Sequence, residues 1–147
     1  MTDDIEKIAK DYFATGYNCA QAVLRTVLEH KGLYFNEAPM VAAGFGGGIS
    51  RRGEICGTLT GAIMAIGVIH EQTIDDRSEL KAATYKSTAE LIEKFSEIHD
   101  TPICNELVGF DMTNPDARQK GNDEGIFSTI CPKFVVDAVK IVIDLFP

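Results

Sequence analysis

Four cysteines are the residues of this 147-residue chain best suited to chemistry. Cys19, Cys56, Cys104 and Cys131 are widely spaced, so the chain has neither the Cys-x-x-Cys motif of thioredoxin-like proteins and zinc ribbons nor the Cys-x-x-Cys-His motif of haem attachment. Any shared site must therefore be assembled by the tertiary fold. A thiolate is both a redox nucleophile and a metal ligand, whereas a free cysteine is often only a packing residue of the core.

Each cysteine lies near a predicted helix start. The partial positive charge of a helix N-terminus favours a thiolate over a thiol. Asn18 is a suitable N-cap before Cys19, and Pro132 suits the first turn of a helix that begins beside Cys131. We expect Cys56 to be the attacking thiolate and to lie close to another cysteine, with Cys19 as the first candidate.

The stretch from Gly44 to Gly67 contains a glycine-rich turn followed by a helix-like run that begins near Cys56. Arg51 and Arg52 precede this run and would add positive charge. The turn lacks the pattern of a dinucleotide-binding loop, and no Gly-Lys-Ser/Thr follows, so a plain tight turn is favoured over a phosphate cradle. Glycines within the run, Gly57, Gly61 and Gly67, each cost roughly 1 kcal/mol of helix propensity, which predicts close approach of another backbone or a ligand.

Apolar residues recur at helical spacing along most of the chain, and no alternating strand pattern competes with them. The stretch 109–125 is polar and rich in turn residues, which predicts mostly loop. We therefore expect an all-α fold, a compact single-domain bundle of about five to seven helices over residues 1–147. The helix at Cys56 and the C-terminal helix should be central in its core. The expected helices cover residues 4–14, 18–31, 37–43, 55–69, 78–99, 103–108 and 132–145.

Composition restricts the class of protein. Hydrophobic residues make up 45% of the chain and charged residues 24%, which is typical of a globular protein. The net charge of −8 argues against nucleic acid as a partner. The acidic N-terminus lacks the apolar region of a signal peptide, and the longest apolar run is shorter than the roughly 20 residues of a membrane span. We expect a cytoplasmic location, where cysteines serve redox or metal chemistry more often than structural disulfides.

The segment Cys56-Gly57-Thr58-Leu59-Thr60-Gly61 resembles the motif of the C-GCAxxG-C-C family of redox-active proteins. Members of that family share four cysteines, which match Cys19, Cys56, Cys104 and Cys131 here. The preceding Gly-Gly-Gly-Ile-Ser-Arg-Arg-Gly-Glu-Ile is also similar to the family, and the one departure is Thr58, where the motif has alanine. The resemblance implies redox activity of the cysteines and leaves the type of chemistry open.

Three interpretations remain. The first is a thiol-based oxidoreductase that uses Cys56, Cys19, Cys104 and Cys131 with an unknown redox partner. In the second, the same four residues hold an iron–sulfur cluster or another thiophilic metal for electron transfer. Wide spacing disfavours that site, because such sites usually draw two ligands from one short loop. The third is a non-catalytic binding or assembly module with packed cysteines, in which the glycine faces and the C-terminal helix could serve a homodimer.

Overall fold

The computed structural model describes residues 2–147, with side chains from Asp4 onward, so Met1 of the expected domain lies outside the described residues. An all-α fold is confirmed, with one more helix than the upper limit of the prediction. Within residues 2–147 the β-structure is limited to one isolated antiparallel bridge between Ile55 and Ile103. The elements are α1 (Thr2–Ala14), α2 (Cys19–Lys31), α3 (Ala38–Ala42), the 3₁₀ helix η1 (Ala43–Phe45), α4 (Gly57–Glu71), α5 (Arg77–His99), α6 (Cys104–Val108), α7 (Pro115–Asp123), the π-helical turn η2 (Ile126–Ile130) and α8 (Cys131–Leu145).

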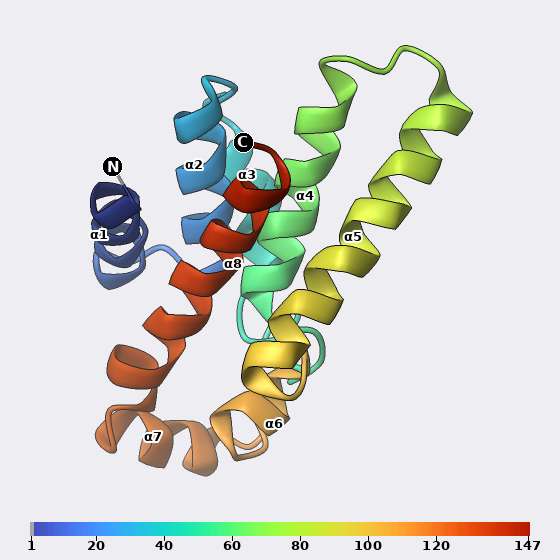
Figure 1. Ribbon diagram of the computed structural model, residues 1–147. Coiled ribbons are helices and arrows are strands. Elements are labelled where there is room, and N and C mark those ends of the chain that lie inside the picture. The colour runs from blue at the N-terminus through green and yellow to red at the C-terminus, as the bar shows by residue number, and fades with distance from the viewer. Residues whose placement is uncertain (1) are drawn as a thin grey trace.

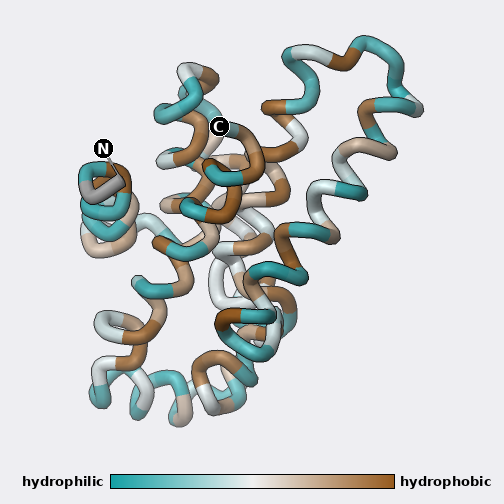
Figure 2. Tube along the Cα trace, in the orientation of Figure 1, coloured by the Kyte–Doolittle hydropathy of each residue, from teal (hydrophilic) through white to brown (hydrophobic). Residues whose placement is uncertain are grey.

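Helices α2, α4 and α8 form the centre of the bundle, with α1 and α5 on its outside (Figure 1). The apolar residues concentrate on the central helices, whereas much of α5 and α7 is hydrophilic (Figure 2). Along the 23 residues of α5, only Leu91 and Phe95 are buried. The expected central position of the Cys56 helix and the C-terminal helix is therefore confirmed. The largest fully buried apolar side chains on the three central helices are Val23, Leu24, Val27, Leu28, Leu59, Ile66, Val135, Val139 and Val142.

Capping residues set the helix ends that matter for the site. Asn18 caps α2: its Oδ1 accepts the Gln21 N–H at 2.9 Å, and the Gln21 side chain accepts the Asn18 N–H at 3.0 Å. The prediction of mostly loop over 109–125 was wrong, because α7 occupies much of it. Asn114 accepts the N–H groups of Asp116 and Ala117, and Pro115 fills the first helical position, so strong capping outweighs the polar composition.

Close backbone approach explains two of the three glycines in α4. A Cβ on Gly61 would lie only 3.0 Å from the Ala20 Cα, and one on Gly57 would overlap the Cys19 sulfur. These glycines let α4 pack directly against the start of α2. No other backbone approaches Gly67, which has no atom of the described chain within 4 Å of its Cβ position.

Helices α2, α4 and α8 all begin at the end of the bundle where α6 and α7 lie (Figure 1). This arrangement brings residues from distant parts of the chain to one end of the molecule. Across residues 2–147, no helix combines the length and apolar character that crossing a membrane would require.

Candidate functional site

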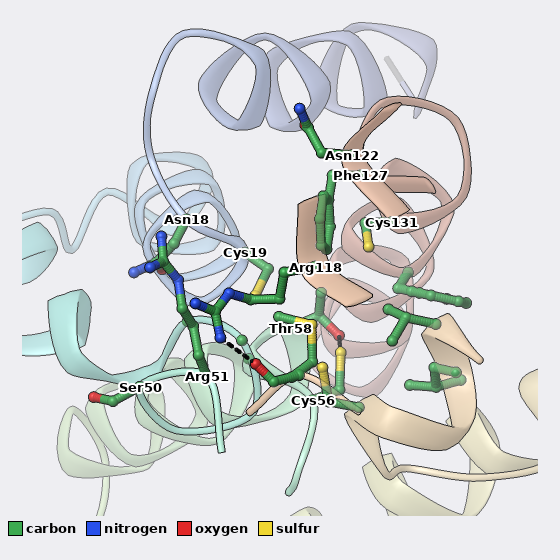
Figure 3. Close-up of a pocket in the computed structure, with 18 of the residues that line it drawn as sticks. Asn18, Cys19, Ser50, Arg51, Cys56, Thr58, Arg118, Asn122, Phe127 and Cys131 are labelled. Atoms are coloured by element: carbon green, nitrogen blue, oxygen red, sulfur yellow. Dashed lines mark hydrogen bonds between the residues drawn. The ribbon is translucent and has the colours of Figure 1, made fainter. Parts of the chain in front are cut away.

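All four cysteines line one cavity of about 870 Å³ at this end of the bundle (Figure 3). Cys19, Cys104 and Cys131 are the first residues of α2, α6 and α8, and Cys56 is the N-cap residue of α4, as the sequence predicted. All four are free thiols. Cys56 and Cys104 are only 5% and 7% exposed, whereas Cys19 and Cys131 are half-buried.

A left-handed turn precedes α4 and forms part of the cavity wall. Residues 47–51 all have positive φ, with values of 67° and 69° at Gly47 and Gly48, and 68°, 48° and 63° at Ile49, Ser50 and Arg51. Left-handed helical backbone costs roughly 1–2 kcal/mol for each non-glycine residue, so a run of three is strained. The turn predicted from sequence is therefore present, but it is strained, and it carries Arg51 to the cavity.

Backbone pairing joins Cys56 to Cys104. On either side of the Ile55–Ile103 bridge, the Cys56 N–H donates to the Pro102 carbonyl at 2.9 Å, and the Cys104 N–H donates to the Glu54 carbonyl at 2.6 Å. The Gly48 Cα also lies against Cys104, because a Cβ there would stand 2.7 Å from the Cys104 Cβ. The glycine turn and the bridge thus fix these two cysteines relative to each other.

Cys131 differs from the other three in its helix start. The π-helical turn η2 runs directly into α8, and the Cys131 N–H donates to the Ile126 carbonyl. Its N–H is therefore already bonded, as are the N–H groups of Cys56 and Cys104. Phe127 of η2 packs edge-on against Phe110 beside the cavity, at a ring-centroid distance of 5.9 Å.

Cys19 lies where three segments meet. Burial raises its pKa, but the backbone N–H groups of Gly47, Ala20, Cys19 itself and Gly57 oppose that rise. These groups belong to the left-handed turn and to the starts of α2 and α4. The charge of Cys19 is in turn the leading electrostatic cause that raises the pKa of each of the other three cysteines. The backbone N–H groups thus favour the Cys19 thiolate, and Cys19 is the sulfur whose charge acts on the other three thiols.

The remaining thiols are held in the neutral form. Burial, followed by the charge of Cys19, raises the pKa of Cys104 to about 11 and that of Cys131 to about 12. The same two causes raise the pKa of Cys56 well above its usual range, and the Thr58 hydroxyl, 3.1 Å from the Cys56 sulfur, opposes this only in part. The sequence predicted that helix starts would lower the pKa values of the cysteines. The net shift is instead upward, because desolvation outweighs the helix dipole.

The cavity also contains residues that the sequence analysis missed. Arg118, Gln119 and Asn122 reach it from α7, in the stretch predicted as loop. The signal that could have found them was the cap-and-proline pair Asn114-Pro115, which marks a helix start. Of the two arginines before Cys56, Arg51 lines the cavity, and Arg52 is not among the lining residues.

Comparison with known proteins places the chain among related sequences. An uncharacterised protein of Archaeoglobus fulgidus is 31% identical over 111 residues, which cover 70% of this chain and 74% of the relative. No solved structure matches the chain. A family model described as "putative redox-active protein (C_GCAxxG_C_C)" matches residues 17–145, a stretch that includes all four cysteines. The chain therefore belongs to the C-GCAxxG-C-C family.

Proposed function

We propose that the protein carries out thiol–disulfide exchange, with Cys19 as the attacking thiol and Cys56 as the thiol that closes the internal disulfide. One observation carries the proposal: the Cys19 sulfur lies against Gly57, the residue that follows Cys56, in a cavity that reaches solvent. The Cys19 charge is also the main electrostatic influence on Cys56. These contacts support a pair formed by Cys19 and Cys56.

The reaction balances as follows. The Cys19 thiolate attacks one sulfur of a substrate disulfide, forms a mixed disulfide and releases the first substrate thiolate. Cys56 then gives up its proton and attacks the Cys19 sulfur, which forms the Cys19–Cys56 disulfide and releases the second substrate thiolate. Two electrons pass from the protein to the substrate disulfide, and two protons become available to the two released thiolates.

The order of attack follows from access and charge. Cys19 is half-buried and faces four backbone N–H groups, which stabilise a thiolate. Cys56 is 5% exposed and is held neutral by burial, so it suits the second, intramolecular step. The sequence pointed to Cys56 as the attacking thiolate, and the geometry supports exchanging the two roles.

A metal centre is the second candidate, because four thiols on one cavity are a donor set that suits an iron–sulfur cluster. Within the described part of the chain, however, no three or more Cys, His, Asp or Glu side chains are gathered closely enough to hold an ion. The wide spacing of the cysteines also gives no short loop with two ligands. We therefore rank thiol–disulfide exchange first.

Anaerobic purification separates the two candidates. We expect a colourless, metal-free protein with four titratable thiols, two of which are lost on mild oxidation. In Cys19→Ser and Cys56→Ser variants, oxidation should no longer remove two thiols, whereas Cys131→Ser, the matched control, should still lose two of its three. Stoichiometric iron with the broad visible absorption of a cluster would instead establish the metal centre.

A further inference from the structure

The charge of the cavity is opposite to that of the whole protein. The chain has a net charge of −8, with 22 Asp and Glu residues against 14 Lys and Arg. Among the described residues that line the cavity, there are two arginines, Arg51 and Arg118, and no Asp, Glu or Lys. A random patch of so acidic a surface would carry carboxylates, so this composition indicates a site for negative charge.

Both guanidinium groups lack a carboxylate partner within the described part of the chain, where the ion pairs join other residues. The strained left-handed turn holds Arg51 at the mouth of the cavity. Arg51 and Arg52 are both exposed, but only Arg51 belongs to the lining. The Arg118 Nη1 donates to the Met112 carbonyl at 2.5 Å, which anchors that side chain and leaves its other N–H groups for a ligand. Figure 3 draws both arginines among the lining side chains around Cys19.

We propose that the cavity binds a small anionic disulfide, whose carboxylate or other acidic group is held by Arg51 and Arg118 while its sulfur meets Cys19. This inference rests on the thiol–disulfide exchange proposed above and adds the charge and size of the substrate. An arginine fork matches the geometry of a carboxylate, which supports that choice of ligand group.

The size and walls of the cavity favour a small molecule over a protein. A volume of about 870 Å³ lies within the range of small-molecule sites, roughly 300–1,000 Å³. Aromatic side chains, Phe13, Phe127 and Phe134, supply apolar surface for the body of the ligand, and Gln119 and Asn122 supply amide groups. The site thus combines two cations, a few polar groups and an apolar wall, as expected for an organic anion.

The two arginines also fit the exchange chemistry. Attack by Cys19 releases a thiolate, and a nearby cation stabilises the negative charge that develops on the leaving sulfur. The turn that carries Arg51 also directs the Gly47 N–H at Cys19. One strained segment therefore serves the substrate anion and the attacking sulfur together, which gives the strain a function.

The test measures how fast the reduced protein reacts with three small disulfides of different charge: the dianion dithiobis(nitrobenzoate), the neutral dithiodipyridine and the dication cystamine. Each rate is divided by the rate of a free thiol with the same reagent, which removes differences in intrinsic reactivity. The wild-type protein should prefer the dianion. Arg51→Gln and Arg118→Gln should each lower the ratio of dianion to neutral rates by roughly three- to tenfold, as expected for loss of one charge near the reacting sulfur.

Two controls make the result specific. Arg52→Gln removes the same charge from the neighbouring exposed residue and should leave the ratio unchanged, and Arg51→Lys should keep most of the preference. Equal normalised rates for the three reagents, or ratios unchanged in both arginine variants, would overturn the anion site while exchange at Cys19 still stands. Failure of Cys19 to react with any of the three, with reduction of a protein disulfide instead, would also overturn it and indicate a protein substrate. Absence of exchange with every disulfide would contradict the proposed function itself.

Discussion

Replacing Gly57 with alanine tests the contact between Cys19 and the start of α4. Alanine stabilises a helix interior by about 1 kcal/mol relative to glycine, and Gly57, as the first residue of α4, would gain at most that much. At Gly57, however, the added Cβ would overlap the Cys19 sulfur and lie 2.9 Å from the Phe45 carbonyl oxygen and 3.3 Å from the Ala20 nitrogen. The favourable and unfavourable effects therefore oppose each other at a single position.

The steric effect should dominate. Overpacking a filled site costs about 1–3 kcal/mol or more, and two of the three neighbours here are backbone atoms that cannot rotate away. We expect Gly57→Ala to lower the free energy of unfolding by about 1–3 kcal/mol. Gly67→Ala is the matched control in the same helix, because its Cβ position is open; it should raise the free energy of unfolding by roughly 0.5–1 kcal/mol.

Urea unfolding followed by far-ultraviolet circular dichroism, in the presence of a reductant, measures both effects. Adding Cys19→Ala to Gly57→Ala removes the sulfur that clashes and should recover part of the loss, with a coupling of about 1 kcal/mol or more. Cys131→Ala in the same background should recover none of it. If Gly57→Ala stabilised the protein as Gly67→Ala does, or if the Cys19 and Cys131 replacements behaved alike, the assigned contact would be refuted.

Three further predictions follow from the site. Burial raises the pKa of Cys104 from 9.0 to about 11, so its neutral form contributes its full stabilisation of the fold below pH 9. As the pH rises from 9 to 11, the free energy of unfolding should fall by up to about 2–3 kcal/mol. Unfolding measurements across this pH range on the wild type and Cys104→Ser should show this difference. Asn114→Ala removes the cap of α7 and should cost about 1 kcal/mol in urea unfolding, whereas no loss would mean that α7 does not need this cap. Thr58→Val removes the hydroxyl beside Cys56 and should slow closure of the internal disulfide, seen as accumulation of the mixed disulfide by mass spectrometry, with little change in the first step at Cys19.

The helices of the core were predictable from sequence because their signals are local. Apolar spacing gave α2, α4 and α8, and Asn18 with Pro132 marked two of their starts. The loop prediction over 109–125 failed because composition was weighted above the Asn114-Pro115 cap, and this error hid Arg118 from the candidate site. The Asn114-Pro115 helix-start signal is therefore a better guide to the structure of this stretch than its polar composition.

The chemistry of the cysteines was only partly predictable. Their positions at helix starts were correct, but their pKa values depend on burial, which arises from long-range packing and not from local sequence. The left-handed turn at residues 47–51 was also beyond sequence reasoning, because Ile49, Ser50 and Arg51 carry no signal for positive φ. The prediction that the glycines mark a close approach was correct at Gly57 and Gly61, where the backbone and sulfur of α2 supply the physical reason.

The most direct test of the central claim is to map the first disulfide that the protein forms. Reduced, metal-free protein is treated with a limiting amount of a small disulfide, its free thiols are alkylated, and a non-reduced tryptic digest is examined by mass spectrometry. The four cysteines lie on four different tryptic peptides, so each pairing gives a distinct mass. We predict a mixed disulfide on Cys19, followed by a linked pair of the Cys19 and Cys56 peptides. A first disulfide between Cys104 and Cys131, or an oxidant adduct on Cys56 while Cys19 stays reduced, would contradict the account.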